Sequence, residues 1–204
     1  MSNLQKLINY QRRIGLTGGI ASGKSTITEY IRTNKKIPIL DADNLSKELI
    51  MPNTIGYKKI LDYLGNQIID KYSSEKAIDR KLLRKIIFED NKSREWIQKL
   101  LHPLIKAKMI EECNQYNKNE IILLVIPLLF EARFEDICTE IWLVKCSKLE
   151  QMQRLVRRDK ISEEEASKII KLQLTFDAKT ELSDVILDNA DDRNRWIDKV
   201  KDLI

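Results

Sequence analysis

The chain contains few of the residues that hold secreted or metal-bound folds together. Its three cysteines, Cys113, Cys138 and Cys146, are odd in number and show no CxxC spacing. This pattern argues against a disulfide framework or a zinc site and predicts reduced thiols in a cytosolic compartment. His102 is the one histidine, so a hydrolase built on a serine–histidine or cysteine–histidine pair would have to use it.

Long hydrophobic segments are also lacking. The longest apolar run, residues 121–130, includes a proline and is too short to span a bilayer. The first residues, MSNLQKLINYQRR, have neither the apolar segment nor the small-residue cleavage site of a signal peptide. We therefore expect a cytoplasmic protein that is not bound to a membrane.

Neither sign of charge dominates the chain. It has 36 basic and 31 acidic side chains, which give a net charge of +5. It has no long block of Lys and Arg and no aromatic-rich motif for binding single-stranded nucleic acid. This balance suits an anionic small ligand and gives no reason to expect nucleic acid. Apolar residues make up 43% of the 204 residues, enough for a buried core, and no repeat or linker divides the chain.

The apolar pattern predicts alternating strands and helices. The continuously apolar run 121–126 is typical of a parallel strand that is buried on both faces. Further strands are predicted at 13–16, 37–40, 140–146 and 184–189. Helical periodicity predicts helices over 24–32, 43–50, 55–64, 79–90, 93–117, 148–159, 162–176 and 191–203, with Pro52 and Pro103 as breaks. We expect an α/β fold, a parallel sheet flanked by helices, with a core over 12–44 and 120–204 and a helical insertion over about 45–119.

The stretch GLTGGIASGKST, residues 15–26, matches the pattern G-x-x-x-x-G-K-[ST] of a phosphate-binding loop. Its glycines let backbone N–H groups converge on phosphate oxygens, Lys24 can reach the outer phosphates, and the Ser25 hydroxyl can bind Mg²⁺. The alternative is a glycine turn with a solvated lysine. The apolar strand before the motif and the helical period after it favour the loop. The predicted ATP-binding residues here are Gly18, Gly19, Ala21, Ser22, Gly23, Lys24, Ser25 and Thr26.

Further motifs follow in an order that resembles the dephospho-CoA kinase family over nearly the whole chain. The resemblance implies transfer of the γ-phosphoryl group of ATP to the ribose 3′-hydroxyl of dephospho-CoA, giving coenzyme A and ADP in the last step of CoA biosynthesis. It also implies a P-loop kinase core, a helical CoA domain, a helical lid over about 148–162, and Mg²⁺. Ala21 stands where a glycine is usual, and we expect the loop to tolerate it unless the backbone requires a positive φ there. The matching stretches are DAD (41–43), IDRKLL (78–83), LHPLI (101–105), IPLLFE (126–131), QMQRLVRRD (151–159) and SDVILDN (183–189), with Gln173 and Lys179.

Asp43 is the predicted catalytic base, because transfer to an alcohol needs a carboxylate that orients the hydroxyl and takes its proton. The resemblance places Asp41 nearer the magnesium ion and the substrate. If this segment is extended, both carboxylates point the same way. The alternative for Asp43 is that it only caps the following helix.

Arginines four residues apart at 154 and 158 are predicted on one helical face. Guanidinium groups suit the charge of a transferring phosphoryl group, and the resemblance places both in the lid, with Arg157 as a weaker third. A solvated basic helix face is the alternative. Asn189 matches a position near adenine, although it could simply end a strand.

Three further positions are assigned less directly. Arg80 is a predicted partner for the diphosphate of the acceptor, or a surface ion pair, and His102 either contacts the substrate or is a structural residue at a helix break. Glu131 lies where a carboxylate often assists the magnesium site. Rival functions are a nucleoside monophosphate kinase and a nucleotide-dependent switch without a small acceptor. We expect ATP and dephospho-CoA as partners and favour a monomer.

Overall fold

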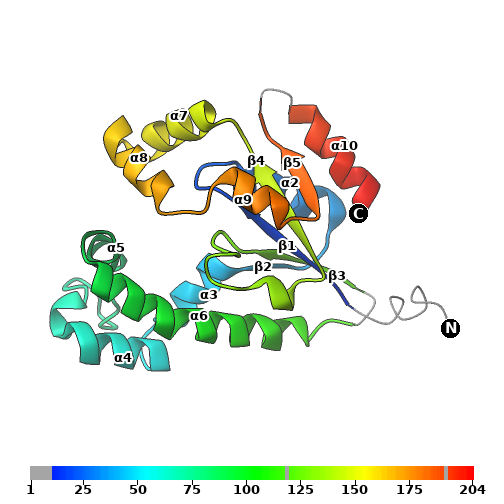
Figure 1. Ribbon diagram of the computed structural model, residues 1–204. Helices are drawn as coiled ribbons and strands as arrows, with labels where there is room; N and C mark the ends of the chain where they lie inside the picture. Colours follow the sequence, from blue (N-terminus) through cyan, green and yellow to red (C-terminus); the bar gives the residue numbers. More distant parts are fainter. Residues whose placement is uncertain (1–10, 118–119, 191–192) are drawn as a thin grey trace. The chain divides into compact units, whose positions relative to one another are not determined.

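A five-stranded parallel sheet forms the core of one unit in the computed structural model of this chain (Figure 1). The structure describes residues 11–117, 120–190 and 193–204, and only the backbone of residues 193 and 194. The chain forms two compact units: the first contains the chain up to Asp41 and from Cys113 to Ile204, and the second contains Ala42–Glu112.

All neighbouring strands of the sheet run parallel, which confirms the predicted α/β class. The order is β2-β3-β1-β4-β5, so the first strand lies at the centre and the chain crosses over between neighbours. Helices connect the strands, as crossovers between parallel strands require. The strands are β1 (Arg12–Gly18), β2 (Ile39–Asp41), β3 (Ile121–Val125), β4 (Glu140–Lys145) and β5 (Val185–Asp188), and the helices of this unit are α2 (Lys24–Lys35), η2 (Glu135–Ile137), α7 (Lys148–Asp159), α8 (Glu163–Lys171), α9 (Phe176–Glu181) and α10 (Arg193–Leu203).

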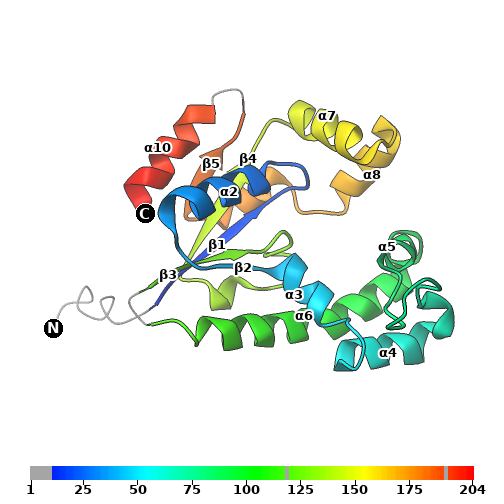
Figure 2. The same cartoon turned by 180° about the vertical axis from the view of Figure 1, so that it is seen from behind.

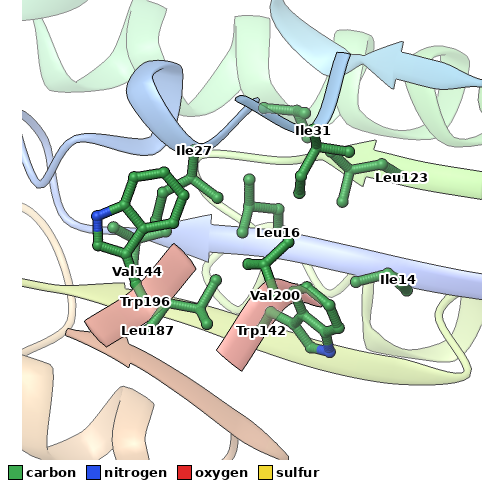
Figure 3. Close-up of a cluster of buried hydrophobic side chains, with 11 residues drawn as sticks. Ile14, Leu16, Ile27, Ile31, Leu123, Trp142, Val144, Leu187, Trp196 and Val200 are labelled. Atoms are coloured by element: carbon green, nitrogen blue, oxygen red, sulfur yellow. The ribbon is translucent and has the colours of Figure 1, made fainter. Parts of the chain in front are cut away.

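One face of the sheet packs against α2 and α10 (Figures 1 and 2). Alternate residues of a strand point to the same face; on this face the central ones are fully or almost fully buried, and Ile39, Ile121 and Val185 are partly buried. Trp196 of α10 stands edge-on to Tyr30 of α2 with ring centroids 5.2 Å apart. This packing joins both helices to the central strand that carries the glycine loop. Figure 3 shows the cluster, which comprises Ile14, Leu16, Ile27, Ile31, Leu123, Val125, Trp142, Val144, Leu187, Trp196 and Val200.

The second unit is helical, as was expected of the insertion over about 45–119. Its longest helix, α6, runs through Pro103, so the prediction of a break at that proline is wrong. Proline removes one backbone donor, but buried Ile97, Leu101, Ile105 and Met109 recur every four residues along the helix and their burial offsets the loss. The elements are α3 (Ala42–Glu48), α4 (Ile55–Leu64), η1 (Asn66–Ile68), α5 (Arg80–Glu89) and α6 (Asn91–Cys113).

The predicted helix over 162–176 ends early, at Lys171, and the next helix, α9, was not predicted, which corrects the sequence interpretation. Helix α8 ends at Lys171, and the hydroxyl of Thr175 accepts a hydrogen bond from the N–H of Ala178 to begin α9. Between them, the N–H of Leu174 donates to the Glu131 carboxylate instead of a helical carbonyl. Helical periodicity reports the exposed and buried faces and does not reveal such a long-range acceptor.

Most other boundaries agree with the predictions to within a few residues, and 55–64 and 148–159 agree at both ends. The predicted helix over 191–203 starts at Arg193 in the structure, and its first two predicted residues lie outside the described ranges. In the described part of the chain, every helix is too short or too polar to cross a membrane.

Candidate functional site

The loop between β1 and α2 has a backbone conformation that favours glycine. Its φ angles are 157° at Gly18, 57° at Ala21 and 99° at Gly23, all in the region that side chains with a Cβ disfavour. The N–H of Ser22 donates to the Gly19 carbonyl at 3.2 Å, which closes the turn. Ala21 therefore meets the condition under which an alanine is strained.

Helix α2 begins directly after this turn with its positive end open. Among the residues that the structure describes, no side chain caps this helix and its first turn contains no acidic residue. By contrast, Ser147 and Ser162 form capping boxes at the starts of α7 and α8. An uncapped helix N-terminus beside a glycine turn presents backbone N–H groups and a partial positive charge, which are the features that bind phosphate.

The Lys24 ammonium is held at the start of the loop. Its Nζ donates to the carbonyl oxygens of Gly18 at 2.8 Å and Gly19 at 3.0 Å. Ser25 and Thr26, next along α2, are exposed. The predicted phosphate-binding residues are thus brought together, with the lysine and the hydroxyls at one end of the helix.

Two residues from distant parts of the chain close the other side of the loop. The Asn189 amide donates through Nδ2 to the Ser22 carbonyl at 2.9 Å, and a Cβ added to Gly23 would lie 1.9 Å from this Nδ2. Arg154 donates from Nη2 to the Asn189 carbonyl at 3.1 Å and to Glu150 at 2.8 Å. The same added Cβ would lie 3.8 Å from Arg154 Nη1, so the guanidinium reaches the loop.

Arg154 has hydrogen-bonding capacity left for an anion. Its Nη1 is buried and, within the described residues, has no hydrogen-bond partner. A buried donor of this kind is costly unless a ligand satisfies it. The sequence prediction of an adenine contact for Asn189 stays a prediction, since in this structure its amide supports the loop.

The second predicted arginine of α7 has another partner. Arg158 donates to Asp159 from Nε at 2.8 Å and from Nη2 at 3.1 Å, and this hydrogen bonding raises its pKa. Arg157 is exposed. Of the three arginines, Arg154 is the one that the structure ties to the glycine loop by hydrogen bonds through Asn189.

Two glutamines hold the loop at Ile20, and sequence analysis assigned neither of them a role. Gln173 accepts a hydrogen bond from the Ile20 N–H at 2.8 Å, and Gln151 donates to the Ile20 carbonyl at 2.9 Å. Both backbone groups of one loop residue are therefore fixed by side chains 131 and 153 residues away. Gln173 could have been found only as part of the family pattern, because its partner is a backbone group.

The two aspartates of the DAD motif lie in different elements. Asp41 ends β2, level with Val125 of β3, and thus at the carboxyl edge of the sheet where open parallel sheets bind ligands. Asp43 lies in the first turn of α3. The prediction that both side chains point the same way along an extended segment is therefore wrong, because the helix begins at Ala42.

Two predicted substrate-binding residues belong to the helical unit. Arg80 is the first residue of α5 and is exposed. His102 lies inside α6 and is half-buried, and burial lowers its pKa. Their contacts with a substrate stay predictions.

A cavity of about 520 Å³ adjoins the loop at Gly19 within the first unit. Lys145, Lys148 and Lys171 contribute basic side chains to its wall, whereas Met152 and Phe176 contribute apolar surface. Its volume lies in the range of sites that hold small molecules. Its composition suits an anion with an apolar part.

Magnesium would have to be bound mainly by phosphate and single side chains. In the described ranges, no group of three or more His, Cys, Asp and Glu side chains could hold a metal. The exposed Ser25 hydroxyl at the start of α2 and the Asp41 carboxylate are oxygen donors that suit Mg²⁺. Such a sparse donor set is typical of magnesium that arrives with a nucleotide.

Known proteins are similar to this chain over nearly its whole length. The family model described as dephospho-CoA kinase matches residues 12–194. The dephospho-CoA kinase of Prochlorococcus marinus strain MIT 9312 is 69% identical over 205 residues, with all of both chains covered. Among solved structures, the Thermus thermophilus protein TT1252 has a TM-score of 0.77 at 25% identity, covering 95% of this chain and 96% of that one.

A solved structure of dephospho-CoA kinase from Campylobacter jejuni has a TM-score of 0.67 at 25% identity and covers 94% of this chain and 96% of its own. The strand order and the glycine loop are those of the P-loop kinase fold, as the sequence predicted. The family match extends from the first residue of β1 to the start of α10. The chain belongs to the dephospho-CoA kinase family.

Proposed function

We propose that this protein transfers the γ-phosphoryl group of ATP to the ribose 3′-hydroxyl of dephospho-CoA. The observation that carries the proposal is the uncapped start of α2, with Lys24 and Arg154 directed to the same glycine loop. Backbone N–H groups, an ammonium and a guanidinium together suit a triphosphate, whose charge grows at the transferred group during reaction.

The residues divide into those that bind phosphate and one that activates the acceptor. Lys24 would bind the outer phosphates, and the unsatisfied Nη1 of Arg154 would donate to the phosphoryl group as it moves. Arg158 would add a second guanidinium once it exchanges Asp159 for phosphate. Asp43 would orient the hydroxyl and accept its proton. Because the Lys24 ammonium and the Arg154 guanidinium are already held at the loop by hydrogen bonds, these two groups need little reorganisation at the moment of transfer.

The substrates require more than the loop. Arg80 and His102 would contact dephospho-CoA in the helical unit, which we propose as the substrate domain, and residues 148–162 would form the lid. When bound with ATP, Mg²⁺ would neutralise phosphate charge, with Ser25 and Asp41 as the protein groups near it. We further propose a cytoplasmic, monomeric enzyme, whose substrates are soluble metabolites.

The proposal is tested by coupled measurement of ADP release with ATP and Mg²⁺, with and without dephospho-CoA. We expect release only with the acceptor, with kcat reduced by about 10²–10⁴ in Asp43→Asn and by at least about 10² in Lys24→Met. Asp62→Asn, an exposed acid on α4, serves as the matched control and should retain activity. Transfer to nucleoside monophosphates instead, or ATP hydrolysis indifferent to any acceptor, would refute the proposal.

A further inference from the structure

A buried ion pair lies behind the glycine loop in a part of the fold that the proposed reaction does not use. Lys179 of α9 is fully buried, and its Nζ lies 2.9 Å from Oε1 of Glu131. A buried ammonium is very unfavourable unless it is paired. Removal of one partner would leave the other charge buried and uncompensated, which is strongly destabilising.

The same carboxylate oxygen holds the segment between α8 and α9. Glu131 Oε1 accepts a hydrogen bond from the N–H of Leu174 at 3.0 Å. This hydrogen bond holds the backbone of the segment between Lys171, where α8 ends, and Phe176, where α9 begins. The Lys179 ammonium thus lies beside the same carboxylate oxygen that accepts the Leu174 N–H.

Gln173, the next residue back along the chain, contacts the glycine loop. Its Oε1 accepts the Ile20 N–H at 2.8 Å. Two adjacent residues therefore make the two contacts: Leu174 binds Glu131 through its backbone N–H, and Gln173 binds the loop through its side chain. The contacts run from Lys179 through Glu131 and Leu174 to Gln173 and Ile20. The three non-covalent distances along this path are 2.9, 3.0 and 2.8 Å.

We infer that Glu131 and Lys179 are positioning residues for nucleotide binding, which act by placing Gln173 against Ile20. Neither residue needs to touch the nucleotide. Because Gln173 and Gln151 together fix both backbone groups of Ile20, the loop keeps its N–H groups convergent before any ligand arrives. Preorganisation of this kind raises affinity by reducing the ordering that binding requires.

Two double variants separate the hydrogen bond from the charge. Glu131→Gln with Lys179→Met removes both charges but keeps a side-chain oxygen for the Leu174 N–H. Glu131→Leu with Lys179→Met removes both charges and the acceptor. Neither leaves a buried charge unpaired, so both are suited to folding, and thermal melts report any difference in stability. Gln173→Leu removes the contact with Ile20 directly.

The measured quantities are the Kd of ATP, from isothermal titration calorimetry, and the separate KM values of the two substrates. We expect the double variant Glu131→Gln with Lys179→Met to have a Kd for ATP within about 3-fold of that of the native protein. The leucine-containing pair and Gln173→Leu should each bind about 10-fold more weakly, with the KM of dephospho-CoA little changed. Adding Gln173→Leu to the double variant Glu131→Leu with Lys179→Met should weaken ATP binding no further, since both changes act through the contact of Gln173 with Ile20.

The inference uses ATP as its probe and so rests on the proposed function. Absence of ATP binding by the native protein would refute that function, whereas native-like ATP binding by the leucine-containing pair would refute the inference alone. Independent effects that multiply to about 100-fold in the combined variant would also overturn it. A lower melting temperature with an unchanged Kd would assign the ion pair to stability only.

Discussion

Replacement of Ala21 by glycine should stabilise this protein. The φ angle of 57° at this position costs a residue with a Cβ about 1–2 kcal/mol. Glycine avoids this strain but loses about 0.5–1 kcal/mol more conformational entropy on folding than alanine does. The difference favours Ala21→Gly by about 0.8 kcal/mol. For a chain of 204 residues this corresponds to a rise of about 2–3 °C in the melting temperature.

The assay is thermal unfolding followed by circular dichroism, with Ala178→Gly as the control. Ala178 lies inside α9, where glycine should lower stability by about 0.5–1 kcal/mol. The two identical substitutions are thus expected to shift the midpoint in opposite directions. Ala21→Val should lower it, because a β-branched side chain is least compatible with a left-handed backbone.

A decrease in the midpoint for Ala21→Gly that equals the decrease for Ala178→Gly would refute the reasoning, since it would mean that residue 21 is not left-handed in solution. An unchanged midpoint in Ala21→Val would do the same. Either result would remove strain as the explanation for the glycine that is usual at this position in the family.

Other substitutions test separate parts of the structure. Gly23→Ala should weaken ATP binding by at least about 10-fold, because a Cβ there lies 1.9 Å from Asn189 Nδ2 at a φ of 99°; calorimetry would detect it, and native affinity would contradict the loop geometry. Burial lowers the pKa of His102, so its contribution to stability is complete above the usual pKa of about 6.5 and is lost as the pH falls through the lowered value. Melting between pH 7 and 5 should therefore decline more steeply in the native protein than in His102→Gln, and parallel curves would exclude this effect. Ser162→Ala, which removes the capping box of α8, should cost about 1 kcal/mol of unfolding free energy in urea titrations, and no change would show that the cap is dispensable.

Local signals account for the parts of the fold that sequence analysis predicted correctly. The loop was recognisable because Gly18, Gly23 and Lys24 lie within one short stretch between an apolar strand and a helix. The parallel sheet was predictable because residues 121–126 are apolar without alternation, which only burial on both faces explains. Both features depend on neighbours in the sequence.

Long-range contacts account for what was missed. The hydrogen bond from Asn189 to Ser22 spans 167 residues, and a side chain that binds a backbone carbonyl leaves no complementary residue to look for. The same holds for Gln151 and Gln173 at Ile20. In the segment between α8 and α9, the partner of Glu131 is again a backbone N–H.

The three thiols of this chain are chemically quiet, which makes the protein easy to label. Burial raises the pKa of Cys138 to about 12 and that of Cys146 to about 11, and Cys113 is 1% exposed. At neutral pH these thiols are therefore protonated, and alkylating reagents react with the thiolate. A cysteine introduced at Tyr72, which is 97% exposed, would therefore take up nearly all of a maleimide dye while the native thiols stay in place.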